Sequence, residues 1–419
     1  MNYKNRIVEK EIKNNLRVFG CVCVEGAKWC GKTETCKQFA KTIIEFQDPT
    51  NKELYKSYIN TDPTFFLQKE KPILFDEWQE NPNIWDIIRY DIDKQREKGL
   101  YLLTGSTGAK ENTTMHSGTG RIVKIKMYPM SLFESGDSNG IISLEKIFKK
   151  TENVLGESDI NISDLARLII RGGFPEAVNL PLEDAMLVMK GYYKGIINEN
   201  VASIDGVKRT PRKVDAFLKS YSRNISTLVT DATIRRDMGK EKTTINEVTF
   251  IDYKNTLEKL FIIDNVEAWS PKIRSKYRIR TSDKKELVDP AIACAALSLN
   301  ENKILNDLNT FGFLFESLCI RDLKVYANSL DGNIYHYKDE SNDEVDAIIE
   351  LNDGRWGAIE IKLGADYIED AAKNLLKFKN KVDTTVVNEP SFLMVLYGGK
   401  NAYTRDDGVL VVPIGCLKN

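Results

Sequence analysis

Residues 26–33 carry the spacing G-x-x-x-x-G-K-T, in which two glycines frame a short loop and a lysine and a threonine follow. Backbone N–H groups of such a loop can face phosphate oxygens, while the lysine reaches the outer phosphates and the threonine hydroxyl binds Mg²⁺. We therefore predict a site for ATP and Mg²⁺, although no residue pattern excludes GTP. The residues expected to contact the nucleotide are Gly26, Ala27, Lys28, Trp29, Cys30, Gly31, Lys32, Thr33 and Glu34.

The elements that must position this loop are predicted on both sides of it. Residues 22–24 are apolar and indicate the end of a buried strand, and residues 35–44 are expected to form the following helix. A strand that delivers the chain to a glycine-rich loop, followed by a helix N-terminus, is the arrangement that binds phosphate. The alternative is an ordinary glycine-containing turn before a helix.

Two carboxylates follow a second apolar run. Residues 72–75 are apolar and are followed directly by Asp76 and Glu77. The apolar run is typical of a strand buried on both faces of a parallel sheet. The carboxyl end of that strand should open beside the loop. We expect Asp76 to hold Mg²⁺ and Glu77 to orient and deprotonate the attacking water. Without the loop, such a run would indicate only a strand end.

Three further side chains are weaker candidates. Residues 100–106 form an apolar run that turns polar, and Thr104 or Ser106 in that run could sense the γ-phosphate or position water. Arg121 follows a glycine-containing stretch and could stabilise transition-state charge, in this chain or in a neighbouring subunit. An ordinary strand end and a surface arginine explain these residues equally well.

Several motifs resemble those of AAA-type ATPases that carry a C-terminal domain of unknown function, DUF4143 (the AAA_14 plus DUF4143 arrangement). The resemblance covers nearly the whole chain and implies a P-loop ATPase with an additional strand and a catalytic glutamate. Trp29 and Cys30 depart from the smaller or charged residues that are usual in the loop. The matching segments are the loop itself, ILFDEWQ (73–79), LLTGS (102–106), GRIVKIKMYPMSLFE (120–134) and RGGFPEAV (171–178).

The composition limits the remaining function classes. The formal net charge is −1 over 419 residues, so any contact with nucleic acid must come from a local patch. Seven cysteines without a C-x-x-C pair argue against structural disulfides and a zinc site, and two histidines argue against a histidine-based site. No apolar signal core and no apolar run long enough to span a bilayer are present. We therefore expect a cytoplasmic protein that does not enter a membrane.

We predict an α/β fold in three parts. Residues 1–150 form an AAA-like P-loop ATPase domain with a parallel sheet, residues 151–290 a helical and winged-helix-like domain, and residues 291–419 a second α/β domain. The first boundary is placed in the polar stretch at 135–160.

The middle region is predicted to be helical. Helices are expected at 165–170 and 187–197, and a capping-box pattern at 244–247 indicates a third helix. A strand is expected at 261–266. The third helix is expected to place Val248, Ile251, Leu257 and Leu260 on one side.

A basic segment follows that expected strand. Five basic residues alternate strictly with other residues, so a strand would place them on one face and could bind DNA phosphates. The alternative is a solvated edge strand on which positive charge prevents aggregation. The five residues are Lys272, Arg274, Lys276, Arg278 and Arg280.

The C-terminal third is predicted to contain a β-hairpin. Its strands, 343–351 and 355–363, flank Asn352-Asp353-Gly354, a loop whose last glycine suits a type I turn with a bulge. That loop pairs Leu351 with Arg355 and therefore Asp346 with Glu360. The pattern places Asp346, Glu360 and Lys362 on one face and Val345, Ala347, Ile349, Leu351, Ile359, Ile361 and Leu363 on the other.

An aspartate followed on the next strand by Glu-x-Lys resembles the PD-(D/E)XK nuclease core, which implies that residues 291–419 form an α/β nuclease-like domain. The resemblance implies that Asp346, Glu360 and Glu316 bind Mg²⁺ and that Lys362 orients or activates the water that attacks a phosphodiester. The proline that names the motif is absent, since Val345 precedes Asp346. A charged outer hairpin face is the ordinary alternative, and such domains can also be inactive.

Two functions remain open on this evidence. In the first, ATP drives a C-terminal domain that binds or cleaves DNA. In the second, a regulatory ATPase controls the docking of a protein partner or its own oligomerisation, and the nuclease-like domain is inactive.

Overall fold

A computed structural model describes residues 3–107, 117–150, 153–201, 207, 209–241, 243–270, 282–385 and 387–419. The chain groups into two compact units. Unit 1 comprises Met1–Pro129, Asn200–Lys208 and Thr256–Phe261, and unit 2 comprises Met130–Glu199, Arg209–Asn255 and Ile262–Asn419. The division into domains 1–150, 151–290 and 291–419 stays a prediction.

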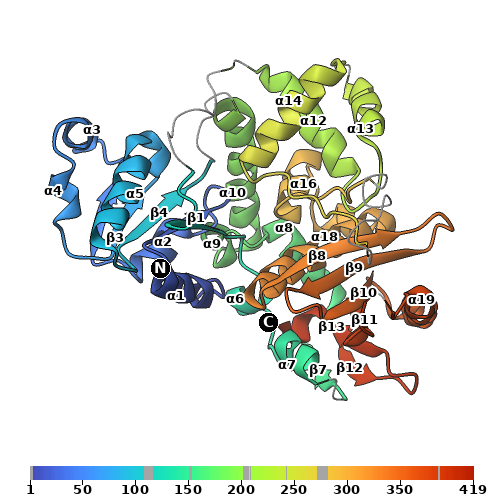
Figure 1. Cartoon of the computed structure of the whole chain (residues 1–419). Coiled ribbons are helices and arrows are strands. Elements are labelled where there is room, and N and C mark those ends of the chain that lie inside the picture. The colour runs from blue at the N-terminus through green and yellow to red at the C-terminus, as the bar shows by residue number, and fades with distance from the viewer. Residues whose placement is uncertain are drawn as a thin grey trace. The chain divides into compact units, whose positions relative to one another are not determined.

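Unit 1 is built on a five-stranded parallel sheet with the order β2-β3-β4-β1-β5, of which Figure 1 labels β3, β4 and β1. The fourth strand lies between the strand that precedes the P-loop and the strand that ends in Asp76, as the resemblance to additional-strand ATPases implies. The strands are β1 Cys21–Glu25, β2 Thr42–Glu45, β3 Ile73–Asp76, β4 Tyr101–Gly105 and β5 Ile122–Lys126.

Helices cover both faces of this sheet. On one face, Cys23, Phe75 and Leu103 pack in a core with Ile88 of α5 and Phe66 of α4. On the other face, Val22, Leu74 and Leu102 pack with Ile12 of α1 and Cys36 of α2. Burial on both faces explains why the strands are almost uniformly apolar. The helices are α1 Glu9–Val18, α2 Lys32–Lys37, α3 Lys52–Thr61, α4 Thr64–Leu67, η1 Trp78–Glu80 and α5 Asn83–Gln95.

The helix predicted at residues 35–44 is wrong in its extent. The helix begins at Lys32 and ends at Lys37, and residues Thr42–Glu45 form strand β2, which pairs with β3. Thr42, Ile43 and Ile44 are β-branched and favour a strand over a helix. Pairing with β3, which is distant in sequence, therefore makes residues 42–45 a strand and not the end of a helix.

Unit 2 contains a seven-stranded mixed sheet with the order β7-β12-β13-β11-β10-β9-β8 and a small two-stranded sheet, β14-β6. Strand β10 runs parallel to β11 and antiparallel to β9. The strands are β6 Ile142–Ser143, β7 Leu155–Glu157, β8 Gly332–Lys338, β9 Glu344–Leu351, β10 Trp356–Lys362, β11 Phe392–Tyr397, β12 Asn401–Thr404, β13 Leu410–Pro413 and β14 Leu417–Lys418.

Two long helices contact this larger sheet. Helix α19, Ile368–Lys381, buries Ala372, Leu375 and Phe378 in a core with Trp356 of β10 and Val395 of β11. Helix α18, Leu308–Ser329, contacts β8, β9 and β10 (Figure 1).

Most of the remaining helices belong to unit 2. Those that precede residue 256 are α6 Leu132–Ser135, α7 Leu144–Lys149, α8 Ile162–Arg171, α9 Pro175–Val178, α10 Leu182–Gly195, α12 Pro211–Arg223, α13 Asp231–Asp237 and η3 Met238–Glu241. The π-helix η2, Ile196–Asn200, and helix α14, Glu247–Lys259, each contribute residues to both units. The later ones are α16 Pro290–Leu297, α17 Glu301–Leu305, α18 Leu308–Ser329, η4 Ala365–Tyr367, α19 Ile368–Lys381 and η5 Ile414–Cys416.

The predicted hairpin register is confirmed. Strands β9 and β10 pair Ile349 with Gly357 and Ala347 with Ile359, which continues to Asp346 opposite Glu360. Leu351 N–H donates to the Arg355 carbonyl over 2.8 Å, and Gly354 has φ of +82°. A glycine bulge therefore closes the turn and sets the register.

The polar stretch at 135–160 contains strands β6 and β7, which pair with β14 and β12, and the boundary expected there stays a prediction. Two predictions for the helix after residue 244 need correction. Helix α14 begins at Glu247, and its cap is Asn246, whose Oδ1 accepts from the Thr249 N–H over 2.8 Å. Val248 and Ile251 of that helix are exposed, whereas Phe250 and Tyr253 are buried.

The predicted strand at 261–266 is replaced by single bridges, Ile263 to Leu287 and Val266 to Lys284. The basic residues Lys272, Arg274, Lys276, Arg278 and Arg280 lie outside the described residues. A winged helix is therefore not among the features that the structure describes.

Two expectations from composition concern residues that the structure does describe. All seven cysteines are free thiols and buried. Within the described ranges, no helix combines the length and the apolar character needed to cross a bilayer.

Candidate functional site

The residues of unit 1 that are candidates for nucleotide binding lie at the carboxyl ends of its parallel strands. Glu25 at the end of β1 pairs with Gly105 at the end of β4, and Phe75, one residue before the end of β3, pairs with Leu103. The P-loop follows β1, Asp76 is the last residue of β3, and Glu77 comes directly after it. The carboxyl ends of the strands form the edge at which α/β sheets bind ligands.

The loop itself adopts a compact arrangement around the lysine. Gly31 has φ of +102°, a left-handed conformation that glycine adopts without strain, and helix α2 begins at the next residue. The Lys32 ammonium donates to the carbonyl oxygens of Gly26 (2.9 Å) and Ala27 (2.8 Å). Phosphate oxygens can take over these donors when a nucleotide enters the loop.

Thr33 and Asp76 meet at the centre of the site. The Thr33 hydroxyl donates to Asp76 Oδ1 over 2.6 Å, and the buried Thr104 hydroxyl donates to the same oxygen over 2.5 Å. Burial raises the pKa of the Asp76 carboxyl above its ordinary value, although both hydrogen bonds oppose this shift. Hydroxyl and carboxylate oxygens are hard donors, so this pair fits Mg²⁺.

Glu77 is held in a strained conformation beside this pair. Its φ is +52°, which is uncommon for a residue with a Cβ, and its N–H donates to the Thr104 hydroxyl over 3.1 Å. Its Oε2 accepts from the Ser106 hydroxyl over 2.9 Å and from the Gln79 amide. The carboxylate is therefore oriented by two neighbours, as a base that aligns water requires.

Not every residue of the loop turns toward a phosphate position. Trp29 is 56% exposed with φ of +65°, Lys28 is half-buried, and the Cys30 thiol is buried against the Met127 carbonyl. Glu34 is exposed and pairs with Lys37 over 3.0 Å. A contact between Glu34 and the nucleotide stays a prediction.

Arg6 contacts the P-loop although no sequence pattern predicts it. Its guanidinium is buried and donates to the carbonyl oxygens of Cys30 (2.7 Å) and Tyr128 (2.8 Å). In a trans peptide the C=O and the next N–H point in opposite directions, so a clamp on the Cys30 carbonyl also fixes the Gly31 N–H. No local pattern links Arg6 to a loop 24 residues later.

Thr104 contacts the residues beside the P-loop and Arg121 does not, and the role expected for Thr104 stays a prediction. Thr104 supports Asp76 and Glu77 through its hydroxyl. Arg121 comes directly before β5, at the amino-terminal ends of the parallel strands and away from the carboxyl ends that carry the P-loop. Its carbonyl accepts from the Cys21 N–H, and its guanidinium pairs with Asp93 over 2.7 Å. Within unit 1, Arg121 lies away from the P-loop, and a role on a neighbouring subunit stays a prediction.

The structure brings together the four side chains predicted for a nuclease-like site in unit 2. Glu316 lies on α18, Asp346 on β9, and Glu360 and Lys362 on β10. The Lys362 ammonium contacts Asp346 Oδ2 at 3.0 Å and Glu360 Oε2 at 2.7 Å. Asp346 and Glu360 are buried, and Glu316 and Lys362 are half-buried, so the four side chains do not form an exposed outer face.

A fifth side chain, Lys284, completes this cluster and was missed. It is 1% exposed, and its ammonium pairs with Glu316, donates to the Asp346 carbonyl oxygen over 3.1 Å and lies 3.7 Å from Asp346 Oδ1. Lys284 lies 32 residues before Glu316 and belongs to no named strand or helix, so spacing could not reveal it. We call Lys284, Glu316, Asp346, Glu360 and Lys362 the ion cluster.

The electrostatics of the ion cluster follow from its burial. Burial raises the pKa of Glu316 and of Glu360, in each case with help from the charge of Asp346. Burial acts in the same direction on Asp346, but Lys362 and Lys284 outweigh it and lower that pKa. Two ammonium groups already contact these three carboxyl groups, so the donor set does not fit a divalent cation. Among the described residues, no group of three His, Cys, Asp or Glu side chains is arranged to hold a metal.

The RGGF segment, residues 171–174, makes structural contacts within unit 2. Gly173 N–H donates to Asp289 Oδ2 over 2.8 Å, and its carbonyl accepts from Met130 N–H over 2.6 Å. Asp289 also pairs with the buried Arg321 over 3.0 Å. A Cβ on Gly173 would lie 2.1 Å from the Met130 carbonyl oxygen, so only glycine fits. The segment thus has a structural explanation.

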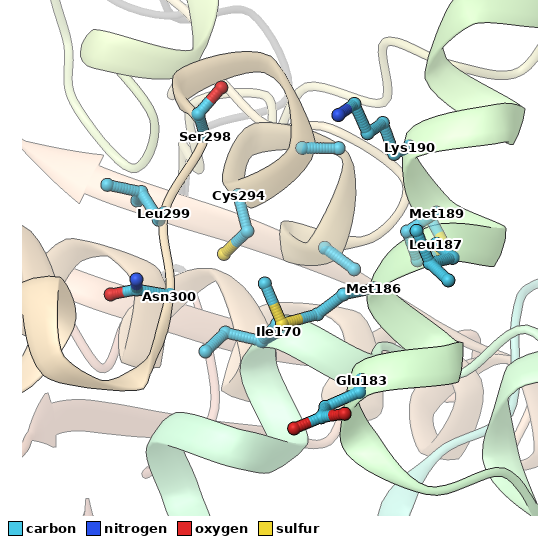
Figure 2. A pocket seen from close by; sticks show the side chains of 12 residues that line it. Ile170, Glu183, Met186, Leu187, Met189, Lys190, Cys294, Ser298, Leu299 and Asn300 are labelled. Carbon is cyan, nitrogen blue, oxygen red and sulfur yellow. The ribbon is translucent and has the colours of Figure 1, made fainter.

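A separate cavity of about 430 Å³ lies within unit 2 among α8, α10 and α16. Figure 2 shows Ile170, Met186 and Cys294 lining it, with Glu183 and Lys190 at different ends. None of the predicted site residues lines it. Burial raises the pKa of the Cys294 thiol well above its usual range, so this thiol is not a ready nucleophile.

Three family models match consecutive parts of the chain. Residues 19–135 match the family described as an AAA domain, residues 162–303 match the domain of unknown function DUF8612, and residues 311–417 match DUF4143. The AAA and DUF4143 matches support an AAA-type ATPase with a DUF4143 region. No curated protein sequence matches the chain.

Solved structures are similar only at a distance. The Walker-type ATPase PABY2304 of Pyrococcus abyssi has 15% identity and a TM-score of 0.41, covering 69% of this chain and 94% of its own. A RuvB variant from Thermotoga maritima has 14% identity and a TM-score of 0.28, covering 62% and 88%. The Hef helicase domain of Pyrococcus furiosus has 11% identity and a TM-score of 0.22, covering 94% and 89%. Similarities of this size decide nothing about this chain.

Proposed function

We propose that this chain binds Mg-ATP at residues 26–33 and hydrolyses it. The observation that carries the proposal is the convergence of Thr33, Asp76 and Thr104 through hydrogen bonds to one carboxylate oxygen, beside a loop with the P-loop spacing. Two strands and the loop must be correctly ordered for these residues to meet. The AAA-domain match over the same region supports the assignment.

Each residue has a distinct part in this proposal. Thr33 and Asp76 hold Mg²⁺, which supplies charge neutralisation for the phosphates when it is bound. Lys32 leaves the loop carbonyls and donates to phosphate oxygens. Glu77, oriented by Ser106 and Gln79, accepts a proton from the attacking water.

The experiment is phosphate release by the purified chain with ATP or GTP, in Mg²⁺ and after chelation. We expect Mg²⁺-dependent hydrolysis that Lys32→Ala abolishes. Lys37→Ala is the matched control, since Lys37 lies on the same helix but pairs with Glu34 and Glu45. Equal turnover in Lys32→Ala and wild type would contradict the site.

For the C-terminal region, we favour a regulatory role without cleavage over a nuclease. The meeting of Glu316, Asp346, Glu360 and Lys362 supports the nuclease-like resemblance. The second ammonium, from Lys284, is the observation that favours an inactive cluster. In this role the ATP state controls docking of a protein partner or a second copy of the chain.

A gel assay of DNA and RNA with Mg²⁺ or Mn²⁺ and ATP separates the two roles. The regulatory role predicts intact substrates and a change in oligomeric state between ATP and ADP. Strand cleavage that disappears in Asp346→Ala would instead establish a nuclease.

A further inference from the structure

The ion cluster contains one more cation than the nuclease resemblance provides. Lys362 occupies the side of Asp346 that carries Oδ2, at 3.0 Å, where the Ile361 N–H also donates over 2.8 Å. Lys284 occupies the other side, 3.7 Å from Oδ1 and 3.1 Å from the carbonyl oxygen. Both carboxylate oxygens of Asp346 therefore already face positive charge.

Lys284 is fixed in this place by its backbone. Its N–H donates to the Val266 carbonyl over 2.9 Å, and the Val266 N–H donates to the Lys284 carbonyl over 3.0 Å. The side chain then crosses into the core and reaches Glu316 on α18. The ammonium thus joins three separate parts of unit 2: this bridge, α18 and the β9–β10 hairpin.

The Lys284 ammonium leaves little space for a divalent ion among the carboxyl groups of the ion cluster. Magnesium, calcium and similar ions need several oxygen ligands at about 2.0–2.6 Å around one point. An ammonium that already contacts two of the carboxyl-bearing residues occupies that space and repels a second cation strongly in a buried environment. Burial lowers the pKa of His336 to about 3, and the charge of Lys284 acts in the same direction.

We infer that Lys284 is a built-in cation that takes the place of a metal ion in the ion cluster, so that Lys284 and a divalent cation exclude one another. The cluster is then a structural ion network in the native chain. The inference concerns metal binding alone and is independent of ATP hydrolysis.

The test is Mn²⁺ binding by the nucleotide-free full chain, measured from the loss of the free-Mn²⁺ electron paramagnetic resonance signal. Lys284→Met should bind one Mn²⁺ more per chain than wild type, and adding Asp346→Asn to that variant should remove the gain. Lys285→Met is the matched control, because Lys285 is also buried on the same segment but pairs with Asp231 over 2.8 Å. It should bind no more Mn²⁺ than wild type.

Folding of each variant is checked by circular dichroism and thermal denaturation. A folded Lys284→Met variant that gains no Mn²⁺ would overturn the inference. A second comparison needs no Lys284 variant: wild type and Asp346→Asn should bind the same amount of Mn²⁺. If wild type binds more, the cluster already holds metal beside Lys284 and the inference is wrong, whatever the outcome of the ATPase assays.

Discussion

Thr33 Oγ1 donates to Asp76 Oδ1 over 2.6 Å, which joins the last residue of the P-loop motif to the last residue of β3. The two residues are 43 positions apart in sequence and belong to strand-loop-helix units that lie on either side of β4. Their contact brings a hydroxyl and a carboxylate to one point at the sheet edge. The proposed Mg²⁺ site rests on this relationship.

The Thr104 hydroxyl hydrogen-bonds to Asp76 and Glu77, and removing this hydroxyl should weaken the proposed Mg²⁺ site. Thr104→Val removes a buried hydroxyl that donates to Asp76 and accepts from the Glu77 N–H. We expect a loss of about 1–3 kcal/mol in unfolding free energy, since a buried donor is left without a partner. Turnover should fall and its Mg²⁺ requirement should rise.

Chemical denaturation and Mg²⁺ titration of phosphate release measure both effects. Thr104→Ser retains the hydroxyl and should recover most of the activity. An unchanged Mg²⁺ dependence in Thr104→Val would show that Thr104 does not position Asp76.

Arg6 should affect nucleotide affinity more than the chemical step. Arg6→Met removes two hydrogen bonds to backbone carbonyls, one of them to Cys30 in the P-loop. Because the clamp orients the loop and not the attacking water, KM for ATP should rise severalfold while kcat changes little. Steady-state kinetics give both constants.

The control is Arg17→Met, since Arg17 is exposed near the end of α1. A fall in kcat with unchanged KM would place Arg6 in the chemistry instead of in loop positioning.

Several of these relationships follow from local sequence. The P-loop spacing, the apolar run before Asp76 and the glycine-closed turn at 352–354 each encode their geometry within a few residues. The hairpin register, with Asp346 opposite Glu360, follows from the turn and from the alternation of apolar residues.

Other features depend on partners far away in the chain and could not be predicted. Residues 42–45 form a strand only because β3 lies beside them, and β7 joins a sheet whose other strands lie after residue 331. Arg6 and Lys284 reach their partners through the fold and not through any sequence period. Val248 and Ile251 were expected on the same side of α14 as Leu257 and Leu260, but they are exposed. A matching apolar pattern does not say which residues of a helix meet the core.

Glu360 gives a prediction for pH. Burial and the charge of Asp346 raise its pKa to about 8 in the folded chain, from an ordinary value of 4.5. A raised folded pKa means that this group favours the folded state below about pH 4.5 and that this contribution is lost as pH rises through about 8. Glu360→Gln, which resembles the protonated acid, should therefore become more stable relative to wild type as pH increases over that range.

Thermal denaturation at pH 5 to 9 measures the difference. Glu389→Gln is the control, because the side chain of Glu389 is 61% exposed. A constant difference between Glu360→Gln and wild type over this range would mean that Glu360 is ionised in the folded chain throughout.

The most direct test of the proposed ATPase is to separate nucleotide binding from turnover in Glu77→Gln. This substitution keeps the size of a side chain that Ser106 and Gln79 orient, but removes its basicity. The account predicts Mg-ATP binding close to that of wild type with phosphate release reduced at least about a hundredfold, as expected for loss of a general base. Glu80→Gln, three residues later and paired with Lys52, should hydrolyse ATP normally. Normal turnover in Glu77→Gln would contradict the account.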